Sequence, residues 1–228
     1  MREGTDNVIR FRLQFMSSYL LIGRERHVLF DCGYPYFLWL VRRRLRQHRI
    51  DPASLGLILL SHGHIDHVGG AIAVRHFTGA PIAIHRADAT CLPTGRFPPL
   101  VPRTWLGWLT CLPANLQRLP PSSRGEPDIL LDDEYDLAPY GIDGRVVHLP
   151  GHTPGSVAVL LESGEAVIAD ALMVNFPFLS DPSYPIYADD MEQVRDSLRR
   201  LLEYRPRIIY TGHGGPVTPA DVRRRYRL

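Results

Sequence analysis

The chain has 228 residues, of which 45% are hydrophobic and 22% are charged, a composition typical of a folded globular protein rather than a disordered or fibrous one. Its formal net charge is only +2 and its apolar runs are far shorter than the roughly 18 residues that span a bilayer, so we expect neither a nucleic-acid nor a membrane partner. The three cysteines at irregular spacing and the start without a signal-peptide pattern indicate no disulfide framework and no secretion, so the expected compartment is the cytoplasm.

The first part of the chain alternates short β-type segments with two helical ones. The run LGLILL at 55–60 is apolar throughout and bounded by turn residues, which indicates a buried strand. Between 35 and 47 apolar residues recur at helical spacing, with arginines on the opposite side. The strands expected here are 11–16, 18–23, 27–33, 55–60 and 81–85, and the helices are 35–47 and 71–77.

A change of composition marks the segment 91–127, which contains eight of the 20 prolines and two of the three tryptophans. We expect an irregular insert there, without a regular sheet or a long helix. A second β-rich set follows, with strands at 145–149, 157–161, 166–170 and 207–210 and a helix at 190–204. The repeated order of strands and helices predicts an α+β protein of two similar halves, with sheets inside and helices outside.

Three histidines and an aspartate lie within six positions in SHGHIDHVGG, residues 61–70, directly after the buried strand. Titratable side chains packed this closely would repel one another or lose their hydrogen bonds unless a cation lay among them. His62 and His64 are two residues apart and can face one ion, whereas Asp66 and His67 follow the bend into the next helix and aim differently. The pattern therefore indicates two neighbouring metal ions.

This pattern, His-x-His-x-Asp-His after a buried strand, resembles the metallo-β-lactamase superfamily. Further matches lie downstream: LPGHTPGS contains His152, AVIADAL contains Asp170, and IIYTGHGG contains His213. FDCG, with Asp31, matches an early structural aspartate of the family. The resemblance extends from about 15 to 217 and implies a four-layer αββα sandwich, with 1–228 as a single domain.

The resemblance also implies a ligand set. His62, His64 and His152 would bind the first ion, Asp66, His67 and His213 the second, and Asp170 would bridge them. Histidine and carboxylate ligands suit zinc best, with iron and manganese as alternatives. An aspartate at position 170, where the best-known β-lactam-degrading members carry a cysteine, favours a hydrolase of the lactonase or glyoxalase II type.

Such a site implies that a hydroxide shared by two metals attacks the carbonyl of an ester, lactone or thioester that has an apolar portion. Asp66 would orient the hydroxide or carry its proton. The tyrosine that many lactonases place three residues after the bridging aspartate is Met173 here, which weakens the lactonase interpretation. The alternatives are a persulfide dioxygenase with one iron ion, a β-lactamase or phosphodiesterase on the same fold, and a metal-dependent binding protein without catalysis.

Two apolar segments outside the metal motifs are candidates for substrate contacts. They are the insert with WLGWL at 105–109 and the segment VNFPFLSDPSYPIY at 174–187. We expect them to wall an apolar pocket for a small-molecule substrate, with a homodimer interface or a simple packed surface loop as the alternatives. The residues that would contact substrate are Trp105, Trp108, Phe176, Phe178, Tyr184 and Tyr187.

Overall fold

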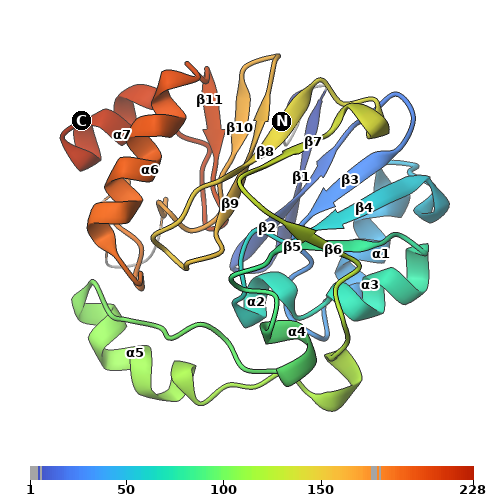
Figure 1. The fold of residues 1–228 in the computed structure, drawn as a ribbon, viewed down its shortest axis with the longest axis horizontal. Coiled ribbons are helices and arrows are strands. Elements are labelled where there is room, and N and C mark those ends of the chain that lie inside the picture. Colours follow the sequence, from blue (N-terminus) through green and yellow to red (C-terminus); the bar gives the residue numbers. More distant parts are fainter. Residues whose placement is uncertain (1–4, 6, 176–178, 180) are drawn as a thin grey trace.

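The computed structural model describes residues 5, 7–175, 179 and 181–228. Within them, one sheet holds six strands in chain order (Figure 1). β1 to β3 are antiparallel, whereas β3 to β6 run parallel. The strands are β1 (Val8–Leu13), β2 (Met16–Leu21), β3 (His27–Phe30), β4 (Leu55–Leu59), β5 (Ile82–His85) and β6 (Ile129–Leu131).

The second sheet holds five strands in the order β11-β10-β9-β8-β7. Neighbouring strands are antiparallel except for the parallel pair β10–β11. The strands are β7 (Glu134–Asp136), β8 (Gly144–His148), β9 (Val157–Leu161), β10 (Glu165–Val167) and β11 (Ile208–Tyr210).

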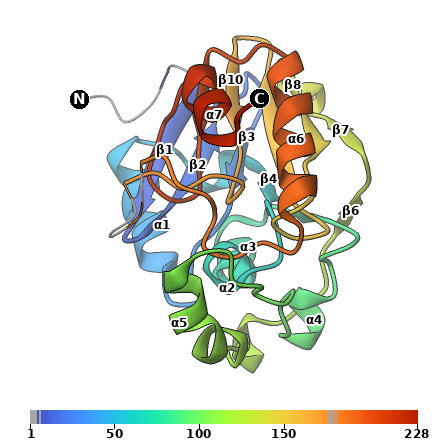
Figure 2. The ribbon, with the colours of Figure 1, turned by 90° about the vertical axis from the view of Figure 1, so that its left-hand side faces the viewer.

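Helices cover the outer face of each sheet, as Figures 1 and 2 show. α1 (Leu38–Gln47) and α3 (Ala71–Thr78) pack on the first sheet, and α6 (Met191–Glu203) and α7 (Pro219–Tyr226) pack on the second. The remaining helices are α2 (Ile65–Val68), α4 (Cys91–Thr94) and α5 (Trp105–Asn115), with short 3₁₀ turns at Pro52–Ser54, Pro121–Ser123 and Ala138–Tyr140.

The layers follow from the alternation of side chains along each strand. In β9, Val157 and Val159 point into the core between the two sheets, whereas Ala158 and Leu160 point toward α6 and α7. All five residues of this strand are buried because both of its faces are covered. Three apolar layers thus separate the four structural ones, and the expected αββα fold is confirmed.

Several element boundaries differ from the sequence-based expectations. The strand expected at 11–16 is broken by a turn, because Gln14 has a φ of 62° and the chain reverses there into β2. The segment expected at 166–170 leaves the sheet after Val167, which frees Asp170 to reach the space beside the other ligands.

The insert contains a regular helix, α5, which the sequence analysis did not anticipate. Thr104 caps it by accepting a hydrogen bond from the backbone N–H of Gly107. Pro113 lies in its last turn, where the loss of one backbone N–H does not prevent the preceding turns from forming.

Candidate metal centre

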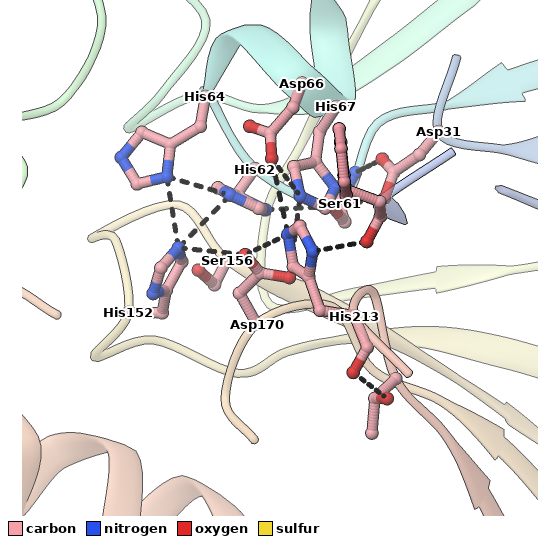
Figure 3. Close-up of polar contacts among 12 residues, drawn as sticks. Asp31, Ser61, His62, His64, Asp66, His67, His152, Ser156, Asp170 and His213 are labelled. Carbon is pink, nitrogen blue, oxygen red and sulfur yellow. Dashed lines mark hydrogen bonds and ion pairs between the residues drawn. The ribbon is translucent and has the colours of Figure 1, made fainter. Parts of the chain in front are cut away.

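The seven predicted ligands come together at one end of the sandwich, on loops that leave four different strands (Figure 3). His62 and His64 follow β4, His152 lies after β8, Asp170 after β10 and His213 after β11. Their ligand atoms form two groups, each with all atoms within 4.8 Å of one another. The first group is His62, His64 and His152, and the second is Asp66, His67, Asp170 and His213.

The first group is a triangle of three buried ring nitrogens. Nε2 of His62 lies 3.0 Å from Nδ1 of His64 and 3.2 Å from Nε2 of His152, and the third side is 3.1 Å. Tetrahedral ligands at zinc–nitrogen bond lengths lie about 3.3 Å apart, so the triangle is close to the spacing that one zinc ion requires.

The second group places two imidazoles against two carboxylates. Nε2 of His213 lies 3.3 Å from Oδ2 of Asp66 and 3.3 Å from Oδ2 of Asp170. Nε2 of His67 lies 3.7 Å from Oδ2 of Asp66 and 3.5 Å from Oδ1 of Asp170. Oδ2 of Asp170 also lies 3.8 Å from Nε2 of His152, in the first group. Asp170 is therefore the residue that faces both groups.

The opposite ring nitrogens are held by acceptors, which fixes the tautomers. Nδ1 of His152 donates to the carbonyl oxygen of Tyr187 at 2.8 Å, and Nδ1 of His213 donates to that of Phe15 at 2.9 Å. Nδ1 of His67 donates to Oδ2 of Asp31 at 2.7 Å. Because each Nδ1 carries the proton, each Nε2 offers its lone pair to an ion.

Asp31 and Ser61 support the cluster from behind. Asp31 is fully buried, and its positive φ of 64° aims its carboxylate at the backbone N–H and the hydroxyl of Ser61, both at 2.8 Å. The Ser61 hydroxyl accepts in turn from Nδ1 of His62 at 2.9 Å. Only glycine fits at position 212, since a Cβ there would lie 2.3 Å from Oδ1 of Asp170.

Two buried polar atoms of the second group have no hydrogen-bond partner among the described residues: Nε2 of His67 and Oδ1 of Asp170. Unpartnered buried polar atoms are rare because each loses its hydration without compensation. A divalent ion contacting both atoms would compensate them. The donor set and these two atoms therefore fit a metal ion.

The two groups differ in their electrostatics. Burial, together with the nearby imidazole of His67, holds the pKa of His62 well below its usual range, and burial lowers the pKa of His64 to about 3. Burial also opposes the protonation of His213, but the carboxylates of Asp170 and Asp66 outweigh it and raise its pKa to about 10. The second group thus attracts positive charge strongly, and an ion that binds there must displace protons.

Asp88 belongs to the site, although no sequence pattern identified it. It is buried, and Oδ2 accepts hydrogen bonds from the backbone N–H of Gly63 at 2.8 Å and the hydroxyl of Thr153 at 2.6 Å. Oδ1 accepts from the backbone N–H of Gly155 at 3.0 Å. Asp88 therefore joins the loop that carries His62 and His64 to the loop that carries His152.

A cavity of about 730 Å³ opens beside both groups of ligands. The ligands that line it are His64, Asp66, His152, Asp170 and His213, and its apolar wall includes Phe97, Leu100, Leu106, Met173 and Ile186. Arg10 and Tyr34, which the sequence analysis did not single out, also line it. The cavity provides the apolar environment expected for a small-molecule substrate.

The predicted substrate contacts are distributed unevenly around this cavity. Tyr187 lines it and shares a hydrogen bond with Thr110. Trp105 and Trp108 do not line it, because they lie on the outer face of α5, where 58% and 72% of their surface is exposed. Tyr184 turns away and donates to the carbonyl oxygen of Arg225. Phe176 and Phe178 lie outside the described residues.

Comparison with known proteins decides the family. The sequence model of the protein family described as "Metallo-beta-lactamase superfamily" matches residues 13–213 of this chain. The chain belongs to this superfamily. The resemblance seen in the sequence is thereby confirmed, and the His/Asp cluster is the metal-binding cluster of a metallo-hydrolase superfamily member.

Two relatives and one solved structure are similar to this chain over most of its length. The probable metallo-hydrolase YflN of Bacillus subtilis is 27% identical over 239 residues, covering 97% of this chain and 89% of the relative. Hydroxyacylglutathione hydrolase GloC of Haemophilus influenzae is 28% identical over 182 residues, covering 77% of each. The solved structure of BJP-1, a subclass B3 metallo-β-lactamase of Bradyrhizobium japonicum, has a TM-score of 0.67 at 18% identity, covering 95% of this chain and 85% of that one. The last likeness shows the metallo-β-lactamase fold alone.

Proposed function

We propose that this protein is a dinuclear metal-dependent hydrolase, with zinc as the resident metal, that cleaves an ester, lactone or thioester with an apolar portion. The observation that carries the proposal is the apolar cavity, because it opens directly on ligands of both groups. When bound, a pair of divalent cations supplies a nucleophile from water near neutral pH and a Lewis acid for a carbonyl oxygen. The residues that would hold the cations are His62, His64, His152, Asp66, His67, Asp170 and His213.

Asp66 is the residue we assign to proton handling. It lines the cavity, and its side chain keeps 18% of its surface exposed, whereas the side chains of His67 and Asp170 are almost fully enclosed. Burial would favour its neutral form, but the imidazoles of His67 and His213 outweigh burial and lower its pKa to about 2. An ionised carboxylate that faces the cavity can orient a water molecule through a hydrogen bond. A proton passed to it would be released again quickly because its pKa lies well below neutral pH.

The wall of the cavity supports the proposed substrate class. Phe97, Leu106 and Ile186 offer apolar contact to an acyl chain, and five of the candidate ligands line the same cavity. Each CH₂ group buried there would raise kcat/KM by about fourfold. The name of the relative GloC denotes hydrolysis of an acyl glutathione, which is a thioester, and this supports the thioester arm of the proposal.

The test is metal analysis of the purified protein combined with a substrate panel. We expect two divalent ions per chain and metal-dependent turnover of esters, lactones or thioesters, with rates that increase from acetyl to octanoyl groups. Cleavage of phosphodiesters alone, or of β-lactams alone, would contradict the proposed carbonyl substrates. If the protein held one iron ion per chain and formed sulfite from a persulfide, it would be an oxidoreductase and not a hydrolase.

A further inference from the structure

The outer face of α5 is an exposed apolar stripe. Its five members fall within one arc of about 100° on the helix, and 58–72% of the surface of each side chain is exposed. The stripe consists of Trp105, Trp108, Leu109, Leu112 and Leu116. Soluble monomers rarely leave so many large apolar side chains together in water, and such a face is typical of interaction surfaces.

The opposite face of the same helix lines the cavity, through Leu106, Thr110 and Ala114. Gly107 lets α5 approach the chain closely, since a Cβ there would lie 2.5 Å from the carbonyl oxygen of Ile186. In Figures 1 and 2, α5 lies at the lower edge of the molecule, outside the four layers. One face of α5 therefore lines the cavity, and its other face carries the exposed stripe.

The charged residues in the sequence segment that carries α5 all have one sign. Residues 89–125 contain no aspartate or glutamate and four arginines, which lie at 96, 103, 118 and 124 and are all exposed. Arg103 precedes the helix and Arg118 follows it. None of the four forms an ion pair with a carboxylate in the part of the chain that the structure describes. This segment therefore carries a formal charge of +4, compared with +2 for the whole chain.

We propose that the stripe on α5 docks onto an anionic lipid surface, with the helix lying parallel to it. Tryptophan and leucine on one helix face with arginines at both ends are typical of helices that lie in a membrane interface. A second copy of the chain docked on the same stripe would bring the arginines that flank the helix in each copy toward one another, whereas anionic headgroups supply the opposite charge. The described chain has no helix long and apolar enough to cross a membrane, which fits docking on the surface. The proposal does not depend on the hydrolase activity.

Vesicle flotation of the full chain tests this proposal without any substrate. We expect binding to vesicles of phosphatidylcholine with 30% phosphatidylglycerol, and at least about tenfold weaker binding to phosphatidylcholine alone, since each arginine near an anionic surface contributes about fivefold. The variant R96Q/R118Q should weaken binding to the anionic vesicles by about 25-fold. Its matched control is R43Q/R46Q, which removes two exposed arginines from α1.

A second set of variants tests the apolar contribution of the stripe to vesicle binding. W108S/L112S should lower binding by at least about tenfold, because it removes two members of the stripe. W39S should leave binding unchanged, since Trp39 is 54% exposed but lies on α1. In W39F the remaining tryptophan fluorescence comes from Trp105 and Trp108 alone and should shift to shorter wavelength on vesicles. Thermal unfolding of each variant shows whether it has folded.

Three results would overturn the proposal. The first is the absence of binding to anionic vesicles by the wild-type chain. The second is an equal loss of binding in W39S and W108S/L112S. The third combines two observations: the wild-type chain does not bind vesicles, and light scattering shows a concentration-dependent dimer that W108S/L112S abolishes. That result would assign the stripe to a second copy of the protein.

Discussion

Replacing Asp88 by asparagine should weaken metal binding at the first group of ligands and spare the second. The asparagine keeps the shape of the side chain and can still accept from Gly63 and Thr153 through its oxygen. Its NH₂ group then faces the backbone N–H of Gly155, which Oδ1 of Asp88 accepts at 3.0 Å in the wild type. One buried donor loses its acceptor, which costs about 1–3 kcal/mol of the free energy of unfolding.

The selectivity of this effect comes from the positions of the contacts. Gly63 lies between His62 and His64, and Thr153 follows His152, so Asp88 holds the backbone beside every ligand of the first group. Loss of a group that orients metal ligands lowers metal affinity by about 10- to 100-fold. The second group has no such contact with Asp88 and is linked to the first mainly through Asp170, so we expect its affinity to fall less than that of the first group.

Calorimetric titration of metal-free protein with Zn²⁺ resolves the two binding steps and measures this difference. Asp132→Asn is the matched control, because Asp132 is exposed and pairs with Arg86 on the surface, so its loss should change stability by less than about 1 kcal/mol. Equal weakening of both steps in D88N, or no change in either, would refute the role assigned to Asp88.

Three further predictions concern ligands and pH. His152→Ala should reduce metal-dependent turnover by more than about 100-fold, which is more than the loss of a group that only orients a ligand. In a steady-state assay, added Zn²⁺ should restore part of this turnover. Full activity of the variant at equimolar Zn²⁺ would exclude His152 as a ligand. Chelation should lower the Tm in calorimetry by about 5–10 °C relative to protein at 100 times Kd of zinc, and an unchanged Tm would argue against binding to the folded state. Burial and the stacked ring of His148 lower the pKa of His85 to about 4, so the neutral ring stabilises the fold above pH 6.5 and this contribution disappears as pH falls through 4. His85→Gln in metal-free protein should therefore flatten the loss of Tm between pH 6.5 and 4, and parallel profiles would contradict the shift.

The cavity is where sequence reasoning about substrate contacts was weakest. Tyr187 reaches the cavity, but Trp105 and Trp108 share a short motif with Leu106 and differ from it only in the face of α5 that they occupy. Composition marked the insert as unusual without showing that it forms a helix. The direction of a helix face depends on what the helix packs against, which is decided by contacts with distant residues such as Ile186.

The sequence by itself indicated two β-rich halves and the cluster at 61–70, because strand burial and close ligand spacing are local patterns. The family resemblance that these motifs carry implied the αββα fold and the seven candidate ligands. Only the tertiary structure decided what supports them. Nδ1 of His152 donates its hydrogen bond to the backbone carbonyl oxygen of Tyr187. Every residue has a backbone carbonyl, so no residue type in the sequence identifies this acceptor. Asp88 lies 25 residues from Gly63 and 65 from Thr153, and these distances close only when both sheets have packed and brought their loops to the same edge.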